Sequence, residues 1–191
     1  MQSTLASEVF AAVEAALGTA PGKERADIYA VSFFIYDDDD DPRRPSLTVG
    51  YNTNQKWHDS IADASGSDEA KWNYAFWLQN DLWATGRGEW ASRIEAWVDG
   101  LGLSYTDEDE EADFDRCMEL GAKITASFVS LACEVAARLH ATGTIVTVFG
   151  RPLPIIIHEL EYYDQIADQT ANANPPGLAG EFVSWVRGGC P

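Results

Sequence analysis

Ile28-Tyr29-Ala30-Val31-Ser32-Phe33-Phe34-Ile35-Tyr36 is the stretch that decides the fold. Nearly every residue in it is apolar, and β-branched and aromatic side chains dominate, which favours a strand buried on both faces. Asp37 to Asp41 and Pro42-Arg43-Arg44-Pro45 then break the pattern and predict a loop. Residues 46–52 resume an alternation that places apolar side chains on one face. We therefore expect a long hairpin whose first strand lies at the centre of a sheet.

Apolar spacing around this hairpin predicts mostly helices. The strongest pattern covers residues 113–141, where apolar residues recur every three or four positions. Weaker patterns predict helices over 3–17, 55–66, 89–98, 164–173 and 178–186, and a helix or a strand over 68–81. Residues 144–149 and 153–160 are rich in β-branched side chains and predict a second hairpin. Strands grouped in hairpins among helices predict an α+β fold.

The expected architecture is one layer of mixed or antiparallel sheet, with about four to five strands, packed with helices. The sequence contains no repeat and no linker that would divide it, so residues 1–191 are expected to form a single domain.

The charge is strongly acidic, with 31 Asp and Glu against 13 Lys and Arg and a formal net charge of −18. Much of the excess lies in two runs that we expect to be surface loops: Asp37, Asp38, Asp39, Asp40 and Asp41, and Asp107, Glu108, Asp109, Glu110 and Glu111. Such a field repels nucleic acid and membrane lipids and attracts basic proteins. Both runs are therefore candidate partner-binding residues. Simple solvation, and for the second run stabilisation of a helix N-terminus, are the alternatives.

Tryptophan is abundant, with 7 residues in the chain. Trp72, Trp77 and Trp83 are further candidate contacts, because Trp and Tyr are enriched at the energetic centres of protein interfaces. Core packing is the alternative for each of them.

Motifs that carry chemistry are absent from the sequence. Gly86-Arg87-Gly88-Glu89-Trp90-Ala91 fits a loose dinucleotide pattern, but no strand precedes it, so we interpret it as a loop that enters a helix. His58, His140 and His158 have no local partners that would complete a metal site. We expect no catalytic residue, no cofactor and no metal. The enzyme alternative is a metal-assisted hydrolase that would combine a histidine with carboxylates such as Asp37, Asp59 or Glu159.

Cysteine usage and hydropathy bear on location. Cys117, Cys133 and Cys190 are odd in number and form no paired motif, which favours reduced thiols in the cytoplasm. We expect neither a signal peptide nor a membrane-spanning segment.

Three phrases resemble a known group of proteins: Asp27-Ile28-Tyr29-Ala30-Val31-Ser32, Val49-Gly50-Tyr51-Asn52-Thr53 and Lys71-Trp72-Asn73-Tyr74-Ala75. They resemble an uncharacterised bacterial family that is itself similar to the SUKH superfamily of immunity proteins. The resemblance implies a non-enzymatic protein that binds and neutralises a toxin of its own cell. The acidic charge would suit a basic toxin such as a nuclease. A self-associating regulatory subunit, for example a homodimer, is the remaining alternative.

Overall fold

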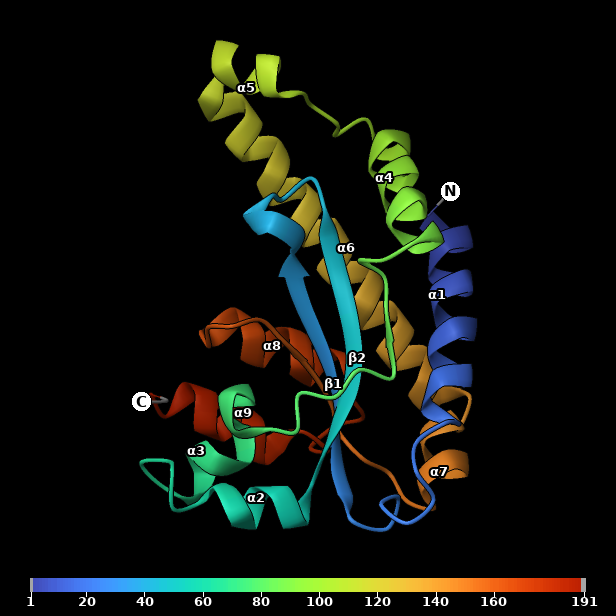
Figure 1. The fold of residues 1–191 in the computed structure, drawn as a ribbon, viewed down its shortest axis with the longest axis vertical. Helices are drawn as coiled ribbons and strands as arrows, with labels where there is room; N and C mark the ends of the chain where they lie inside the picture. The colour runs from blue at the N-terminus through green and yellow to red at the C-terminus, as the bar shows by residue number, and fades with distance from the viewer. Residues whose placement is uncertain (1, 190–191) are drawn as a thin grey trace.

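The computed structural model describes residues 2–189, with side chains from residue 5 onward, so Cys190 lies outside the described residues. Its centre is one four-stranded mixed sheet in the order β3 (Trp83–Ala84), β2 (Pro45–Thr53), β1 (Ile28–Asp37) and β4 (Ile155–His158). β1 pairs antiparallel with β2 and parallel with β4. The α+β prediction and the first hairpin are confirmed, and β1 lies inside the sheet, as its composition predicts (Figure 1).

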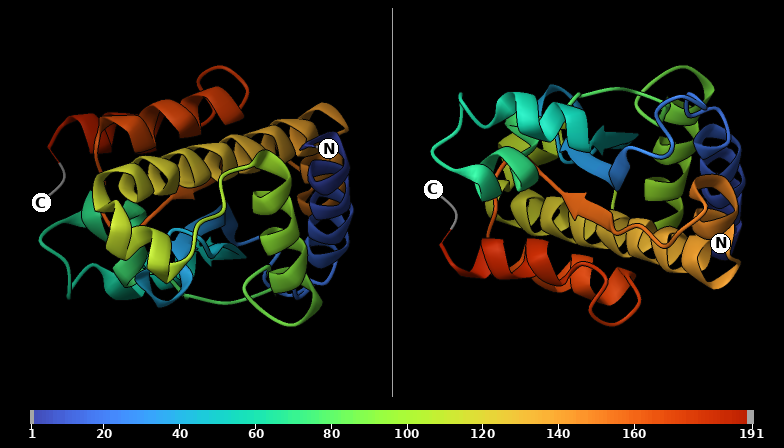
Figure 2. Two further views of the ribbon diagram at one scale, coloured as in Figure 1. Left: turned by 90° about the horizontal axis from the view of Figure 1, so that it is seen from above. Right: turned by 90° about the horizontal axis from the view of Figure 1, so that it is seen from below.

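The first face of the sheet carries the main hydrophobic core. Val31, Phe33 and Ile35 of β1 are at most 2% exposed there. Three helices supply the opposing side chains: α1 (Gln2–Leu17), α4 (Glu89–Leu101) and α6 (Phe114–Ala141). Figure 2 shows α6 lying beside the sheet, with α1 and α4 gathered near one end of this helix. The predicted long helix is confirmed.

The second face of the sheet holds a smaller aromatic core. Ala30 and Ile156 contribute to it from the strands, and Trp72 and Trp77 are 5% and 4% exposed within it. The elements around it are α2 (Asn54–Ser60), α3 (Ser67–Trp72), the 3₁₀ turn Tyr74–Phe76, α8 (Asp164–Ala173) and α9 (Gly180–Arg187). Within 68–81 the regular structure is therefore helical. Trp72 and Trp77 are buried in this core, which corrects the prediction that they contact a partner.

The predicted second hairpin is wrong. Residues Thr144–Phe149 form a short helix, α7, between Gly143 and Gly150, whose φ angles are 76° and 74°. The helix buries Ile145 and Phe149, four positions apart, so tertiary burial overrides the strand preference of its β-branched residues. Of the predicted strand 153–160, only Ile155–His158 forms a strand, β4. It pairs with β1, whereas the predicted hairpin would have paired it with residues 144–149.

The outer edge of β4 is hydrogen-bonded by side chains from α8 and the residue after it. Asn174 accepts from the Ile155 N–H at 2.8 Å and donates to the Ile155 carbonyl at 2.7 Å. The Thr170 hydroxyl lies 3.1 Å from the Ile157 N–H and 3.0 Å from its carbonyl oxygen. These side chains replace the missing neighbouring strand, so the buried main chain of β4 keeps its hydrogen bonds.

Helix α6 is the only one, within the described part of the chain, that length and composition would allow to cross a membrane. A core helix has the same properties, and Ile124, Phe128 and Leu139 of α6 are fully buried.

Asn174→Ala should lower the free energy of unfolding by about 2–4 kcal/mol, because it leaves the Ile155 N–H and carbonyl buried without partners. Urea unfolding followed by circular dichroism measures the change. Asn172→Ala is the matched control, since Asn172 is exposed on the same helix, and it should change stability by less than about 0.5 kcal/mol. Equal effects of the two substitutions would contradict the role of Asn174.

Candidate functional site

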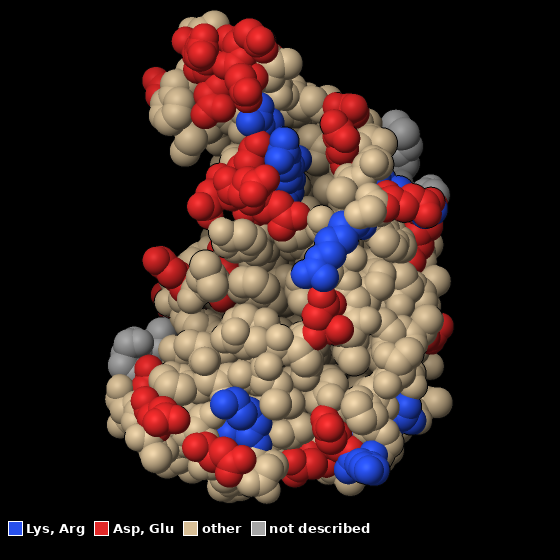
Figure 3. All heavy atoms as spheres, viewed as in Figure 1, with Lys and Arg blue, Asp and Glu red and all other residues tan. Residues whose placement is uncertain are grey.

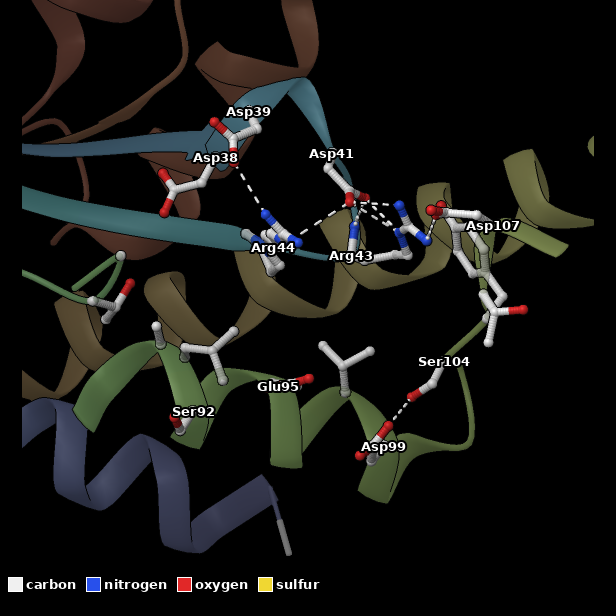
Figure 4. A pocket seen from close by; sticks show the side chains of 18 of the residues that line it. Asp38, Asp39, Asp41, Arg43, Arg44, Ser92, Glu95, Asp99, Ser104 and Asp107 are labelled. Carbon is white, nitrogen blue, oxygen red and sulfur yellow. Dashed lines mark hydrogen bonds and ion pairs between the residues drawn. The ribbon is translucent and has the colours of Figure 1, made fainter. Parts of the chain in front are cut away.

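An acidic groove of about 860 Å³ lies between the tip of the β1–β2 hairpin and helix α4. Its far end is closed by the 104–106 connection and the start of α5 (Asp107–Ala112). Eight carboxylates and two guanidinium groups line it: Asp38, Asp39, Asp41, Glu95, Asp99, Asp107, Glu108 and Asp109, with Arg43 and Arg44 (Figure 4). Figure 3 shows Asp and Glu side chains gathering over α5 and over the hairpin tip, with basic side chains between them. The fold thus brings both predicted acidic runs to one groove.

The hairpin tip supplies the first wall. Asp38 to Asp40 form a 3₁₀ turn in which Asp39 and Asp40 have φ angles of 61° and 57°. Asp residues tolerate this left-handed region better than most, and it lets the chain reverse here. The Asp38 carboxylate accepts from the Ser46 hydroxyl at 2.8 Å. It also lies against Gly86, where a Cβ would come within 2.3 Å of it, so the tip is seated on the segment that leads into α4.

The second acidic run is helical, which corrects the loop prediction. Thr106 and Asp109 form a reciprocal capping box at the start of α5, with the Thr106 N–H donating to the Asp109 carboxylate at 2.9 Å. These hydrogen bonds lower the pKa of Asp109 below its ordinary value. A separate residue, Asp113, caps α6. The acids of the run therefore stabilise the N-terminus of their own helix, where negative charge is favoured.

Arg43 ties the two runs together across one end of the groove. Its guanidinium lies 2.8 Å from the Asp41 carboxylate and 2.6 Å from that of Asp107, and 5.2 Å from the centre of the Tyr105 ring. Burial works against the charge of Asp41, but the hydrogen bonds from Arg43 outweigh it and lower the pKa of Asp41. Among the ion pairs of the described residues, Arg43–Asp107 alone joins the hairpin tip to α5.

Helix α4 supplies carboxylates that the sequence analysis did not single out. Glu95 and Asp99 are one helical turn apart on the same face and both are exposed. Asp99 accepts from the Ser104 hydroxyl. Within the described residues, neither forms an ion pair with a basic side chain, so their charge is not neutralised locally. A run of consecutive acids is visible in a sequence, whereas two acids spaced along a helix become a cluster only after folding.

Four predicted acids lie outside the groove lining. They are Asp37, Asp40, Glu110 and Glu111. Asp37 ends β1, and one of its carboxylate oxygens is buried without a hydrogen-bond partner among the described residues. Burial, and then repulsion from Glu159 and Asp41, raise the pKa of Asp37 above its ordinary value.

Trp83 is half-buried against Trp90, with ring centres 5.0 Å apart, and it packs on the main core.

The three histidines lie in separate environments. His58 is exposed and stacks on Trp57, His140 bonds to Asn174, and His158 is buried. Within residues 5–189 no three His, Cys, Asp or Glu side chains gather in a way that could hold a metal ion. In particular, Asp37, Asp59 and Glu159, which the hydrolase alternative would combine with a histidine, form no such group within these residues. Burial raises the pKa of Cys133 to about 11, which keeps this thiol protonated at neutral pH.

His158 is part of a buried polar pair on the second face of the sheet. Its Nε2 lies 2.8 Å from the Ser32 hydroxyl, and the two residues are 1% and 2% exposed. The aromatic rings of Phe34, Tyr74 and Tyr162 lie around it. Burial lowers the pKa of His158 to about 4, so the imidazole is neutral at physiological pH.

Acid should therefore destabilise the protein through His158. The unfolded chain binds a proton below about pH 6.5, whereas the folded chain does so only near pH 4, so stability is lost as the pH falls between these values. Urea unfolding at pH 7.5 and pH 5 should show this loss, which is at most about 3 kcal/mol over the full range. His158→Gln should reduce the pH dependence, and an undiminished loss of stability in this variant would contradict the role of His158.

Arg43→Gln should lower the free energy of unfolding by about 1–2 kcal/mol, because it breaks the tie between Asp41 and Asp107 and leaves two acids close together. Thermal and urea unfolding measure this. Arg44→Gln is the control, since the side chain of Arg44 is 63% exposed, and it should have less than half the effect. The difference should shrink in 0.5 M salt, because salt screens charges.

Comparisons with protein-family models, with curated proteins and with solved structures each found no match. The likeness to immunity proteins therefore stays a prediction from the sequence.

Proposed function

We propose that this chain is a non-enzymatic binding protein that holds a basic protein partner in the acidic groove. The observation that carries the proposal is the groove itself, which joins carboxylates from three parts of the chain in one concave surface. A large excess of one sign in a concavity focuses the electrostatic field and raises the rate at which oppositely charged partners associate.

The environment of Arg43 indicates which chemical group the groove suits. Two carboxylates and one aromatic ring surround its guanidinium. Arginine is well matched to such a site because its planar fork donates to carboxylates while its face stacks on a ring. Glu95 and Asp99 offer the same kind of acceptor to arginine or lysine side chains of a partner.

A toxin is the partner that we propose, on the strength of the three sequence phrases. An acidic inhibitor would occupy the positive surface that a nuclease uses to bind phosphate, and would compete with its substrate. Protection of the producing cell from its own toxin would be exerted in the cytoplasm.

Charge reversal in the groove should weaken the binding of a cationic probe. The double substitution Glu95→Lys and Asp99→Lys should reduce affinity for fluorescein-labelled nona-arginine by roughly tenfold or more at physiological salt. Fluorescence anisotropy measures it. The control pair Asp63→Lys and Asp68→Lys changes the net charge equally at exposed positions in or beside α3, outside the groove.

Equal weakening by both pairs would mean that the probe responds to net charge alone, and would contradict the groove as the site. Co-expression with the toxin encoded beside the gene tests the role: wild type should protect the cell, and the groove variant should protect less than the control variant.

A further inference from the structure

A row of half-buried aromatic side chains continues from the hairpin tip along the second face of the sheet. It consists of Tyr36, Phe34, Tyr74, Tyr162 and Trp185, and we refer to it as the aromatic strip. Phe34 stacks on Tyr36 and on Tyr74, with ring centres 6.1 Å and 4.8 Å apart. Tyr162 meets Trp185 edge to face at 4.9 Å. The buried ring of His158 lies between Tyr74 and Tyr162 and supports both.

The strip has the composition of an interface centre. Its five members all remain partly exposed, unlike Trp72 and Trp77 in the core beneath. Leu160 and Tyr163, next to it in the β4–α8 loop, are 65% and 44% exposed. Rigid aromatic side chains that bury a large area with little loss of conformational entropy provide most of the affinity in many protein interfaces.

Carboxylates border the strip. The Tyr36 hydroxyl donates to Asp40 at 2.7 Å, and the Tyr163 hydroxyl donates to Glu159 at 3.0 Å. Aromatic faces beside carboxylates suit cationic side chains, because the ring quadrupole and the negative charge both attract them. The chain itself contains this arrangement: the Lys71 ammonium lies 4.6 Å from the Trp57 ring centre and is paired with Glu181.

The strip and the acidic groove meet at the hairpin tip. Tyr36 is bonded to Asp40, while Asp38, Asp39 and Asp41 of the same tip line the groove. A partner seated in the groove that crosses the tip would therefore reach Tyr36 first and Phe34 next. A second copy of this chain would bring an equal net charge of −18 against these carboxylates, which opposes self-association.

We infer that the aromatic strip is the second half of the partner-binding surface, and that it receives a segment of the same basic partner in which cationic and aromatic side chains alternate. This inference rests on the proposed function. The groove, whose acids are mostly exposed, sets the association rate and its salt dependence. The strip sets the dissociation rate, because its aromatic rings lose water on contact.

Two blocked hexapeptides test the inference: Arg-Trp-Arg-Trp-Arg-Trp and Arg-Gly-Arg-Gly-Arg-Gly. The first should bind wild type roughly three- to tenfold more tightly, with the difference in the dissociation rate. Aromatic NMR signals of Tyr36, Phe34 and Tyr74 should shift only with the tryptophan peptide. Tyr36→Ser should remove the preference, and Tyr36→Phe, which keeps the ring, should retain it. Thermal unfolding confirms that both variants fold.

The outcomes separate the two proposals. Suppose that wild type binds both peptides with equal affinity and that charge reversal at Glu95 and Asp99 abolishes the binding of both. This result would support the groove as the binding site and would overturn the role of the aromatic strip. A preference that survives Tyr36→Ser also overturns it. So does a concentration-dependent dimer in sedimentation that broadens the strip signals without peptide, because a second copy would then be the occupant. Peptide affinity that is unchanged by the groove substitutions would contradict the proposed function instead.

Discussion

Burial of β1 on both of its faces is the constraint on which the rest of the structure depends. Val31 and Phe33 face the main core, while Ala30 and Ser32 face the smaller one, and all four are at most 2% exposed. A strand of this kind is stable only if helices cover both sides of the sheet. The long helix α6 packs on the main core, and side chains of α3, α8 and α9 fill the smaller core, so the remaining elements are placed by the need to cover β1.

The acidic tip follows from the same strand. β1 and β2 extend to a hairpin that reverses beside α6 (Figure 1). Pro42 packs close to Gly121 of α6, where a Cβ would come within 2.9 Å of it, which brings the tip beside the start of α6. The neighbouring carboxylates repel one another, and the Arg43 tie offsets part of that repulsion. Placing like charges together costs stability, and proteins commonly accept such a cost at sites that bind.

The elements that depend on the local order of apolar and polar residues could be predicted from the sequence. Alternation and the Asp-Pro break specified the first hairpin, and regular spacing specified α6. The pairing of Val31 with Ile155 could not be predicted, because it joins distant segments and depends on α6 lying between them. Residues 144–149 have the side chains of a strand, yet burial of Ile145 and Phe149 between two glycines makes them helical. The acidic runs are visible in the sequence, but Glu95 and Asp99 join them only in space. The half-exposed Tyr36 and Phe34 lie within an apolar strand pattern, which does not distinguish them from core residues.

Side chains complete the hydrogen bonding of β4 at one edge of the sheet, and of β2 beside the two-residue strand β3. On β4 the hydrogen bonds of Ile155 and Ile157 are taken by Asn174 and Thr170. On β2, Asn80 bonds the Tyr51 N–H at 2.8 Å and its carbonyl at 3.0 Å, and the Thr85 hydroxyl bonds the Leu47 N–H at 2.8 Å. An open edge would invite another chain to add a strand, which is a common route to peptide capture and to amyloid-like stacking. With those donors and acceptors occupied, these positions of β4 and β2 offer no free main chain to an added strand, so a partner would meet side chains there.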